Sequence, residues 1–193
     1  MSELGAASGT PAVVLIGPPA AGKSRVGKRL ARILDLPVID TDKVIAAAHG
    51  PIPDIFAAHG EPHFRALERA AVDDALRLRA VVSLGGGAVL DPDTQAQLAG
   101  LPVVLLTATP EAVAGRLEKG TRPLSASIDA WVALVEKRRP LYERLAAATW
   151  DTSSRPIDRI AAEIADWATA RERTATEQRA SETTDRTPEG DRA

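Results

Sequence analysis

The sequence predicts an α/β fold in which helices cover both faces of a parallel, five-stranded sheet. Two observations carry this prediction. Short, largely apolar runs such as 12–16 and 81–84 stop at glycine, which is typical of strands buried on both faces. Between these runs, apolar residues recur at helical spacing. Strands that alternate with helices in this way form βαβ units, which build a parallel sheet.

The elements follow one another in a regular order. The first strand covers Ala12 to Ile16, and the helix from Gly22 to Leu34 places Val26 and Leu30 on one apolar stripe. We expect the other strands at 37–40, 81–84, 102–106 and 149–152. We expect the other helices at 41–79 with interruptions near residues 50–51 and 60, from 110, at 131–148 and from 156.

A chain of 193 residues has room for one domain of ordinary size. We assign this domain to residues 11–170, with a flexible segment before it at 1–10. Within it we expect substrate-binding helices at about 41–80 and a mobile lid at about 118–129. From Arg171 to Ala193 the sequence has almost no apolar residues, so it cannot bury enough surface to offset its ordering entropy. We therefore predict a disordered tail at 171–193.

Composition excludes several classes of protein. The chain has no cysteine, which excludes disulfides and cysteine-ligated zinc. Its net charge of −2 and its aromatic content of 3% give no general attraction to nucleic acid. The mean hydropathy is −0.09, and no apolar run approaches twenty residues. We expect a cytoplasmic protein with no nucleic-acid or membrane partner.

The segment from Gly17 to Ser24 has the sequence GPPAAGKS, which fits the phosphate-loop pattern G-x-x-x-x-G-K-[ST]. It lies between a predicted strand and a predicted helix, as that mechanism requires. In such a loop Lys23 contacts the β- and γ-phosphates, and Ser24 binds Mg²⁺. The alternative is a glycine-rich turn with no ligand. The strand–loop–helix context favours nucleotide binding.

Two acids, Asp40 and Asp42, follow the second predicted strand directly. Alternate residues leaving a strand point to opposite sides, so one acid can face a metal and the other a substrate hydroxyl. The alternative is purely structural: Asp40 ends the strand, and Asp42 is a first-turn acid stabilised by the helix dipole. The pair alone does not decide between these interpretations.

Six further features appear in a fixed order along the chain. They are IPDIF at 52–56, GEPHFRALE at 60–68, SLGGGA at 83–88, RPL at 122–124, RRPLY at 138–142 and DT at 151–152. With the phosphate loop and the two acids, this series resembles the shikimate kinases, a branch of the small P-loop kinases related to nucleoside monophosphate kinases. The resemblance covers Val13 to about Pro156 and excludes the tail.

The resemblance implies the strand order 2-3-1-4-5 and the transfer of the ATP γ-phosphoryl group to the 3-hydroxyl of shikimate, in the biosynthesis of aromatic amino acids. It implies Mg²⁺, held by Ser24 and, through water, by Asp40, and we expect a monomer. The implied catalytic residues are Lys23, Asp42 and Arg122. The implied shikimate-binding residues are Asp42, Arg65, Gly85, Gly86, Gly87 and Arg138, with the two arginines on the substrate carboxylate. The implied ATP-binding residues are Gly17, Ala20, Ala21, Gly22, Lys23, Ser24, Arg25, Arg116, Arg122 and Arg155. Among these, Arg116 and Arg155 match positions that flank the adenine in the family.

Two alternatives remain open at this point. A kinase of the same fold could act on another hydroxy acid such as gluconate, or on a nucleoside monophosphate. Arg65, Arg138 and the triple glycine favour shikimate over both. A P-loop protein without catalysis could instead bind nucleotide as a regulatory signal. Such a protein has no need for Asp42 or the two arginines, and this sequence retains all three.

Overall fold

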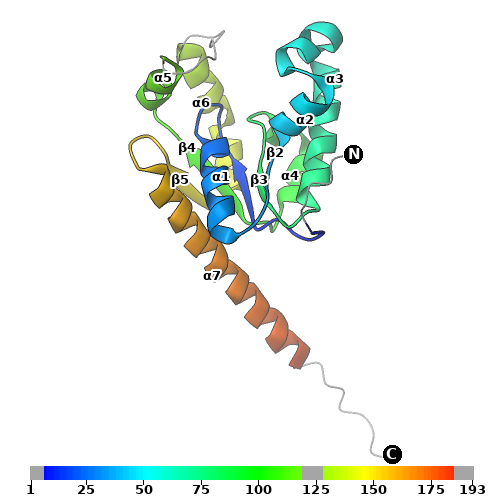
Figure 1. The fold of residues 1–193 in the computed structure, drawn as a ribbon, viewed down its shortest axis with the longest axis vertical. Helices are drawn as coiled ribbons and strands as arrows, with labels where there is room; N and C mark the ends of the chain where they lie inside the picture. The colour runs from blue at the N-terminus through cyan, green and yellow to red at the C-terminus, as the bar shows by residue number, and fades with distance from the viewer. Residues whose placement is uncertain (1–6, 119–127, 185–193) are drawn as a thin grey trace, which may run out of the picture.

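A computed structural model of the chain describes residues 7–118 and 128–184. At its centre is a parallel sheet with the order β2-β3-β1-β4-β5 (Figure 1). In register, Val14 of β1 lies opposite Val82 of β3 and Val103 of β4. The strands are β1 (Val13–Ile16), β2 (Val38–Asp40), β3 (Val81–Ser83), β4 (Val103–Thr107) and β5 (Ala148–Asp151). The predicted fold class and strand order are confirmed.

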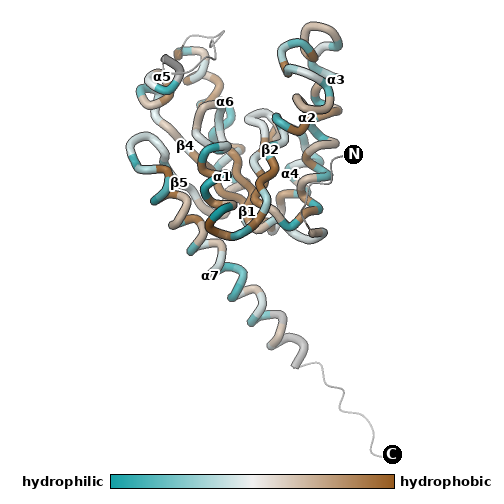
Figure 2. The backbone as a smooth tube through the Cα atoms, viewed as in Figure 1, coloured by the Kyte–Doolittle hydropathy of each residue, from teal (hydrophilic) through white to brown (hydrophobic). Residues whose placement is uncertain are grey.

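Helices cover both faces of the sheet. They are α1 (Lys23–Leu34), α2 (Thr41–His49), α3 (Ile52–Leu76), α4 (Pro92–Leu98), α5 (Pro110–Glu118), α6 (Ile128–Leu145) and α7 (Ile157–Thr184), with a 3₁₀ turn at η1 (Ala88–Leu90). Because side chains alternate along β1, Val13 and Leu15 pack with α1 and α7, whereas Val14 and Ile16 pack with α3, α4 and α6. In Figure 2 the strands form the hydrophobic centre between these two layers.

The substrate-binding region predicted at 41–80 forms α2 and α3. The predicted interruption near residues 50–51 separates these helices. The one near residue 60 is a kink inside α3, where Gly60 has φ 77° and ψ 173°. Two elements, η1 and α4, were not predicted, because they are too short for helical spacing to be visible.

The N-terminal segment is partly ordered. Flexibility was predicted for residues 1–10, but Gly9 donates a hydrogen bond to the carbonyl of Arg77 at 2.9 Å, and Arg79 donates to that of Ala7 at 2.8 Å. These backbone bonds attach the segment beside the start of β3. The prediction is therefore wrong for residues 7–10, while residues 1–6 lie outside the described part of the chain.

The C-terminal prediction is also wrong in part. Instead of a disordered segment from Arg171, helix α7 continues to Thr184 and projects from the body of the protein (Figure 1). Its first turns are packed on α1, and an established helix propagates at little further cost. Glu172 also pairs with Arg79 at 2.8 Å. Residues 185–193 lie outside the described chain, as do residues 119–127 of the predicted lid.

In the ranges 7–118 and 128–184 no helix combines the length and the apolar character needed to cross a membrane. Helix α7 has the length, but the turns that project from the body carry mostly polar residues (Figure 2).

Candidate active site

The phosphate loop connects β1 to α1. Gly17 adopts φ 135°, and a Cβ atom there would overlap the carbonyl oxygen of Leu106, so only glycine fits. Gly22 precedes α1 with φ 90° and gives the helix no side-chain cap, which leaves its first N–H groups directed at the loop. A helix N-terminus of this kind binds anions. The predicted loop is therefore formed as its sequence pattern requires.

Lys23 lies inside this loop. Its Nζ donates to the carbonyl oxygens of Gly17 at 2.7 Å and Pro18 at 2.9 Å. Burial lowers the pKa of Lys23 to about 8, although the nearby carboxylates of Asp42 and Asp40 oppose this shift. Lys23 is thus a loop cation held at the centre of the site and close to both predicted acids.

Ser24 and Asp40 meet at the end of β2. The hydroxyl of Ser24 donates to Oδ2 of Asp40 at 2.5 Å, and Lys43 lies 3.6 Å from the same carboxylate. Hydroxyl and carboxylate oxygens are the donors that Mg²⁺ prefers, and this ion commonly takes one or two protein ligands together with substrate phosphates. In the described ranges no group of three or more His, Cys, Asp or Glu residues could hold a metal by itself. The pair therefore fits a magnesium ion shared with a nucleotide.

The glycine segment, Gly85 to Gly87, follows β3 and is surrounded by side chains of the protein itself. A Cβ atom on Gly85 would come within 2.5 Å of Asp42 Oδ1. On Gly86 it would approach Pro19 of the phosphate loop at 3.1 Å, and on Gly87 it would overlap Arg65. The missing side chains therefore allow the phosphate loop, the second acid and the first predicted arginine to approach one backbone segment.

The first glycine of the segment also has a bonded backbone N–H group. The N–H of Gly85 donates to Oγ1 of the buried Thr41 at 3.1 Å. That donor is therefore engaged within the protein. Thr41 lies between the two predicted acids, and it is oriented by its own bond to the carbonyl of Ser83 at 3.4 Å.

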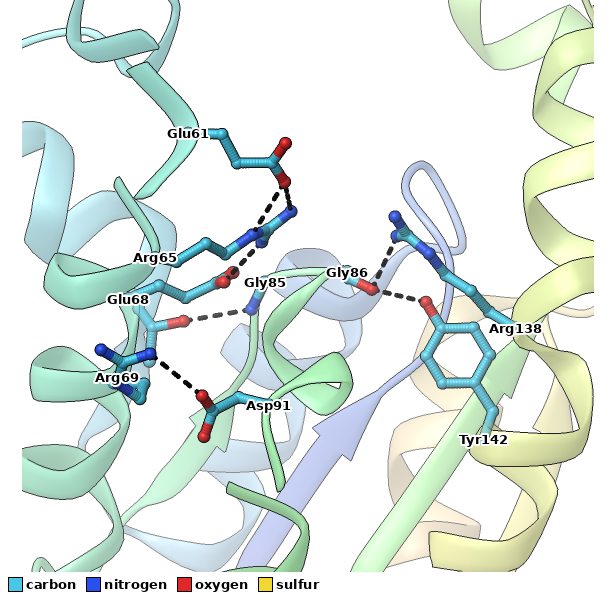
Figure 3. A network of polar contacts seen from close by, with 10 residues as sticks. Glu61, Arg65, Glu68, Arg69, Gly85, Gly86, Asp91, Arg138 and Tyr142 are labelled. Carbon is cyan, nitrogen blue, oxygen red and sulfur yellow. Dashed lines mark hydrogen bonds and ion pairs between the residues drawn. The ribbon is translucent and has the colours of Figure 1, made fainter. Parts of the chain in front are cut away.

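Arg65 is held by two acids of its own helix, α3. Its Nη1 pairs with Glu68 at 2.6 Å and its Nη2 with Glu61 at 2.9 Å (Figure 3). The Glu68 side chain is 5% exposed, and Glu61 is 63% exposed. Burial raises the pKa of Glu68, although its bond to Arg65 opposes this shift. The sequence analysis assigned no role to Glu68. The one sequence feature that could have pointed to it is its position three residues after Arg65.

Arg138 approaches the glycine segment from the opposite side, on α6 (Figure 3). Its Nη1 donates to the carbonyl oxygen of Gly86 at 3.1 Å, and the buried Tyr142 donates to the same oxygen at 2.6 Å. Burial also raises the pKa of Tyr142. Residues four apart share one helix face, so Arg138 and Tyr142 can reach the same carbonyl oxygen. The sequence alone does not show which carbonyl this is. The sequence assigned no role to Tyr142.

The phosphate loop opens into a cavity of about 800 Å³. Asp40, Asp42 and Gly86 line it, whereas Arg65 and Arg138 lie beyond its lining. Six basic side chains line the cavity, compared with two acidic ones, and this excess of positive charge favours a polyanionic ligand. The six are Lys23, Arg25, Lys28, Lys43, Arg116 and Arg155.

Both arginines expected beside the adenine line this cavity. Arg116 donates to the carbonyl oxygen of Ala20 at 2.9 Å and to Thr152. Burial lowers the pKa of Arg116. Arg155 pairs with Glu163 of α7. Arg122, the third predicted catalytic residue, lies outside the described residues.

A parallel sheet with a phosphate loop after its central strand, and with acids and arginines at the same edge, defines a P-loop phosphotransferase. The family model for shikimate kinase matches residues 19–169. The shikimate kinase of Salinispora tropica is 45% identical over 161 residues, which is 80% of this chain and 96% of that protein. That of Corynebacterium efficiens is 42% identical over 159 residues, which is 80% of this chain and 94% of that protein.

A solved structure of the shikimate kinase from Acinetobacter baumannii, in complex with shikimate, superposes with a TM-score of 0.76 and 28% identity. The match covers 84% of this chain and 94% of that one. This chain belongs to the shikimate kinase family, and the resemblance inferred from its sequence is confirmed.

Proposed function

We propose that this chain transfers the γ-phosphoryl group of ATP to the 3-hydroxyl of shikimate, with Mg²⁺ as the metal. The observation that carries the proposal is the convergence on the glycine segment. Pro19 of the phosphate loop, Asp42 and Arg65 all pack against Gly85–Gly87, and Arg138 bonds to its backbone. This arrangement brings a phosphate site, a hydroxyl-orienting acid and two carboxylate-binding groups within reach of one small molecule.

The nucleotide occupies the basic cavity in this proposal. Lys23 exchanges the carbonyls of Gly17 and Pro18 for the β- and γ-phosphates, and the charged ligand favours its protonated form. Ser24 and, through water, Asp40 would hold the metal, which would neutralise charge on the transferring phosphoryl group. Arg116 and Arg155 lie along the wall where the base is expected.

Asp42 accepts a hydrogen bond from the reacting hydroxyl and orients its oxygen toward the γ-phosphorus. Phosphoryl transfer needs little covalent chemistry from the protein, so positioning and charge stabilisation account for most of the rate. The close approach of Asp42 to Gly85 limits how far this carboxylate can move.

The substrate carboxylate binds between Arg65 and Arg138, which present planar guanidinium groups from opposite sides of the glycine segment (Figure 3). Arg65 has two acidic partners already. Because Glu61 is exposed and Glu68 is buried, the incoming carboxylate replaces Glu61, while Glu68 keeps the guanidinium in place. On the other side, Tyr142 keeps its hydrogen bond to the carbonyl oxygen of Gly86 when the guanidinium of Arg138 turns to the substrate.

The test is a coupled assay of ADP release with shikimate, gluconate and nucleoside monophosphates as acceptors. We expect turnover with shikimate to exceed turnover with the others by orders of magnitude. Faster turnover with gluconate or a nucleoside monophosphate would reject shikimate as the substrate. Nucleotide binding without turnover of any acceptor would favour the regulatory alternative.

A further inference from the structure

Thr152, directly after β5, has a buried hydroxyl that joins three segments of the protein. Its Oγ1 lies 2.9 Å from the carbonyl oxygen of Ala21 in the phosphate loop and 3.0 Å from that of Thr107 at the end of β4. The residue is 2% exposed. A hydroxyl has one proton and two lone pairs, so the two carbonyls share its donor while it can accept elsewhere.

Arg116 of α5 supplies the bond that this hydroxyl accepts. Its Nη1 donates to Oγ1 of Thr152 at 3.3 Å and to the carbonyl oxygen of Ala20 at 2.9 Å, and its Nη2 donates to the carbonyl of Thr152. Thr152 and Arg116 therefore hold two successive carbonyls of the phosphate loop and also bind each other.

Those carbonyls belong to the part of the loop with unusual backbone geometry. Ala20 adopts φ 62°, in the left-handed region that a residue with a Cβ rarely occupies, and Gly22 follows with φ 90°. A loop that turns N–H groups toward an anion must turn carbonyl groups away from it, and buried carbonyls need donors. Arg116 supplies the donor for Ala20, and Thr152 the donor for Ala21.

We propose that Thr152 is a positioning residue of the nucleotide site, whose hydroxyl fixes the carbonyl of Ala21 and the guanidinium of Arg116 so that the phosphate loop keeps its anion-binding shape. This inference rests on the proposed assignment of the loop as the ATP site. It gives Thr152 no contact with shikimate and no part in the transfer step itself.

The decisive variant is Thr152→Val, which preserves the shape of the side chain and removes its hydroxyl. We expect the Kd for ADP, measured by calorimetry without acceptor, to rise on the order of tenfold or more, because two carbonyls and Arg116 lose a partner. The KM for ATP should rise by a similar factor, while the KM for shikimate stays within about twofold. Thr152→Ser keeps the hydroxyl and should restore nucleotide affinity.

Thr149→Val is the matched control, because Thr149 lies on β5, three residues before Thr152, and is exposed. A role confined to packing β5 against β4 would lower the thermal midpoint of Thr152→Val and leave its Kd for ADP unchanged, which would overturn the proposal. Equal weakening in Thr152→Ser and Thr152→Val would also overturn it, since the hydroxyl would then be irrelevant. If the unmodified chain fails to bind ADP, the proposed function fails first, and this inference fails with it.

Discussion

Arg65 lies against the bare backbone of Gly87, with its guanidinium in the space that a Cβ atom on that residue would occupy. Gly87 has φ −98° and ψ −14°, a conformation open to any residue, so glycine is needed there for space and not for backbone freedom. The position of Arg65 on α3 thus depends on the absence of a Cβ atom at Gly87. The relationship can be tested by adding one methyl group.

Gly87→Ala should leave the fold intact and displace Arg65, whose flexible side chain can move aside. We expect the KM for shikimate to rise roughly tenfold or more through misplacement of a carboxylate-binding group, with the KM for ATP little changed. Gly115→Ala in α5 is the matched control, since a Cβ atom there meets no atom within 4 Å. An unchanged KM for shikimate in Gly87→Ala would separate Arg65 from substrate binding.

Lys23→Met should lower phosphoryl transfer by orders of magnitude, because it removes the cation that binds the β- and γ-phosphates. The thermal midpoint should change by only a few degrees, since the bonds of Lys23 lie within its own loop. The exposed Lys137→Met on α6 serves as the control. Near wild-type turnover of Lys23→Met would show that this loop is not the ATP site.

Asp42→Asn and Asp40→Asn should impair catalysis in different ways. Asp42→Asn weakens the contact to the reacting hydroxyl, and we expect kcat to fall by roughly 10²–10⁴-fold. Asp40→Asn removes the negative charge of the carboxylate that accepts the hydrogen bond of Ser24. The Mg²⁺ concentration at half-maximal rate should therefore rise. Magnesium titrations of both variants decide the matter. Identical magnesium curves would contradict the division of roles.

Arg65→Ala and Arg138→Ala should each cost roughly 2–5 kcal/mol in kcat/KM for shikimate, because the substrate carboxylate loses a charge-assisted partner. The double variant should lose less than the sum, since both groups bind one anion. Arg69→Ala, one turn further along α3 and paired with Asp91, is the control. Wild type and variants are compared on shikimate and on a triol without the carboxylate. Equal losses on both compounds would reject carboxylate recognition.

Truncation after Ala170 should leave kcat and both KM values unchanged, because the removed turns lie far from the phosphate loop (Figure 1). It removes the ion pair between Glu172 and Arg79, whose side chains are 56% and 36% exposed. Such surface pairs contribute about 0–1 kcal/mol, so the thermal midpoint should fall by at most a few degrees. A larger fall in a melting curve would show that these turns stabilise the body.

The strands and the catalytic loop could be predicted because local sequence determines them. An apolar run followed by a glycine-rich loop and a helical stripe leaves few alternatives for β1 and α1. Composition misled the interpretation of residues 171–184, because the lack of an apolar face argues against packing but not against helix propagation. No glycine or proline interrupts the chain between Pro156 and Pro188, and Ala, Arg, Glu and Gln are good helix formers.

The site residues that the sequence missed owe their surroundings to the fold. Tyr142 and Thr152 bond to carbonyls far away in the chain, those of Gly86 and Ala21, and Glu68 pairs with Arg65 of its own helix in a buried position that only the fold creates. A glutamate three residues after an arginine is most often a solvated helix position, and only the fold buries this one. By contrast, a motif or a strand end marks the positions of four other site residues, so the sequence alone could predict them. These are Lys23, Ser24, Asp40 and Asp42.

Helix α7 also determines how the molecule tumbles in solution. The turns beyond Ala170 extend the helix by about 20 Å, at 1.5 Å per residue, from an otherwise rounded body. A sphere carrying a rod turns more slowly about axes across the rod than about the rod itself. Amide N–H bonds in a helix point along its axis, so those of α7 reorient with the slow component, and nuclear spin relaxation distinguishes them from the amides of helices that run across it.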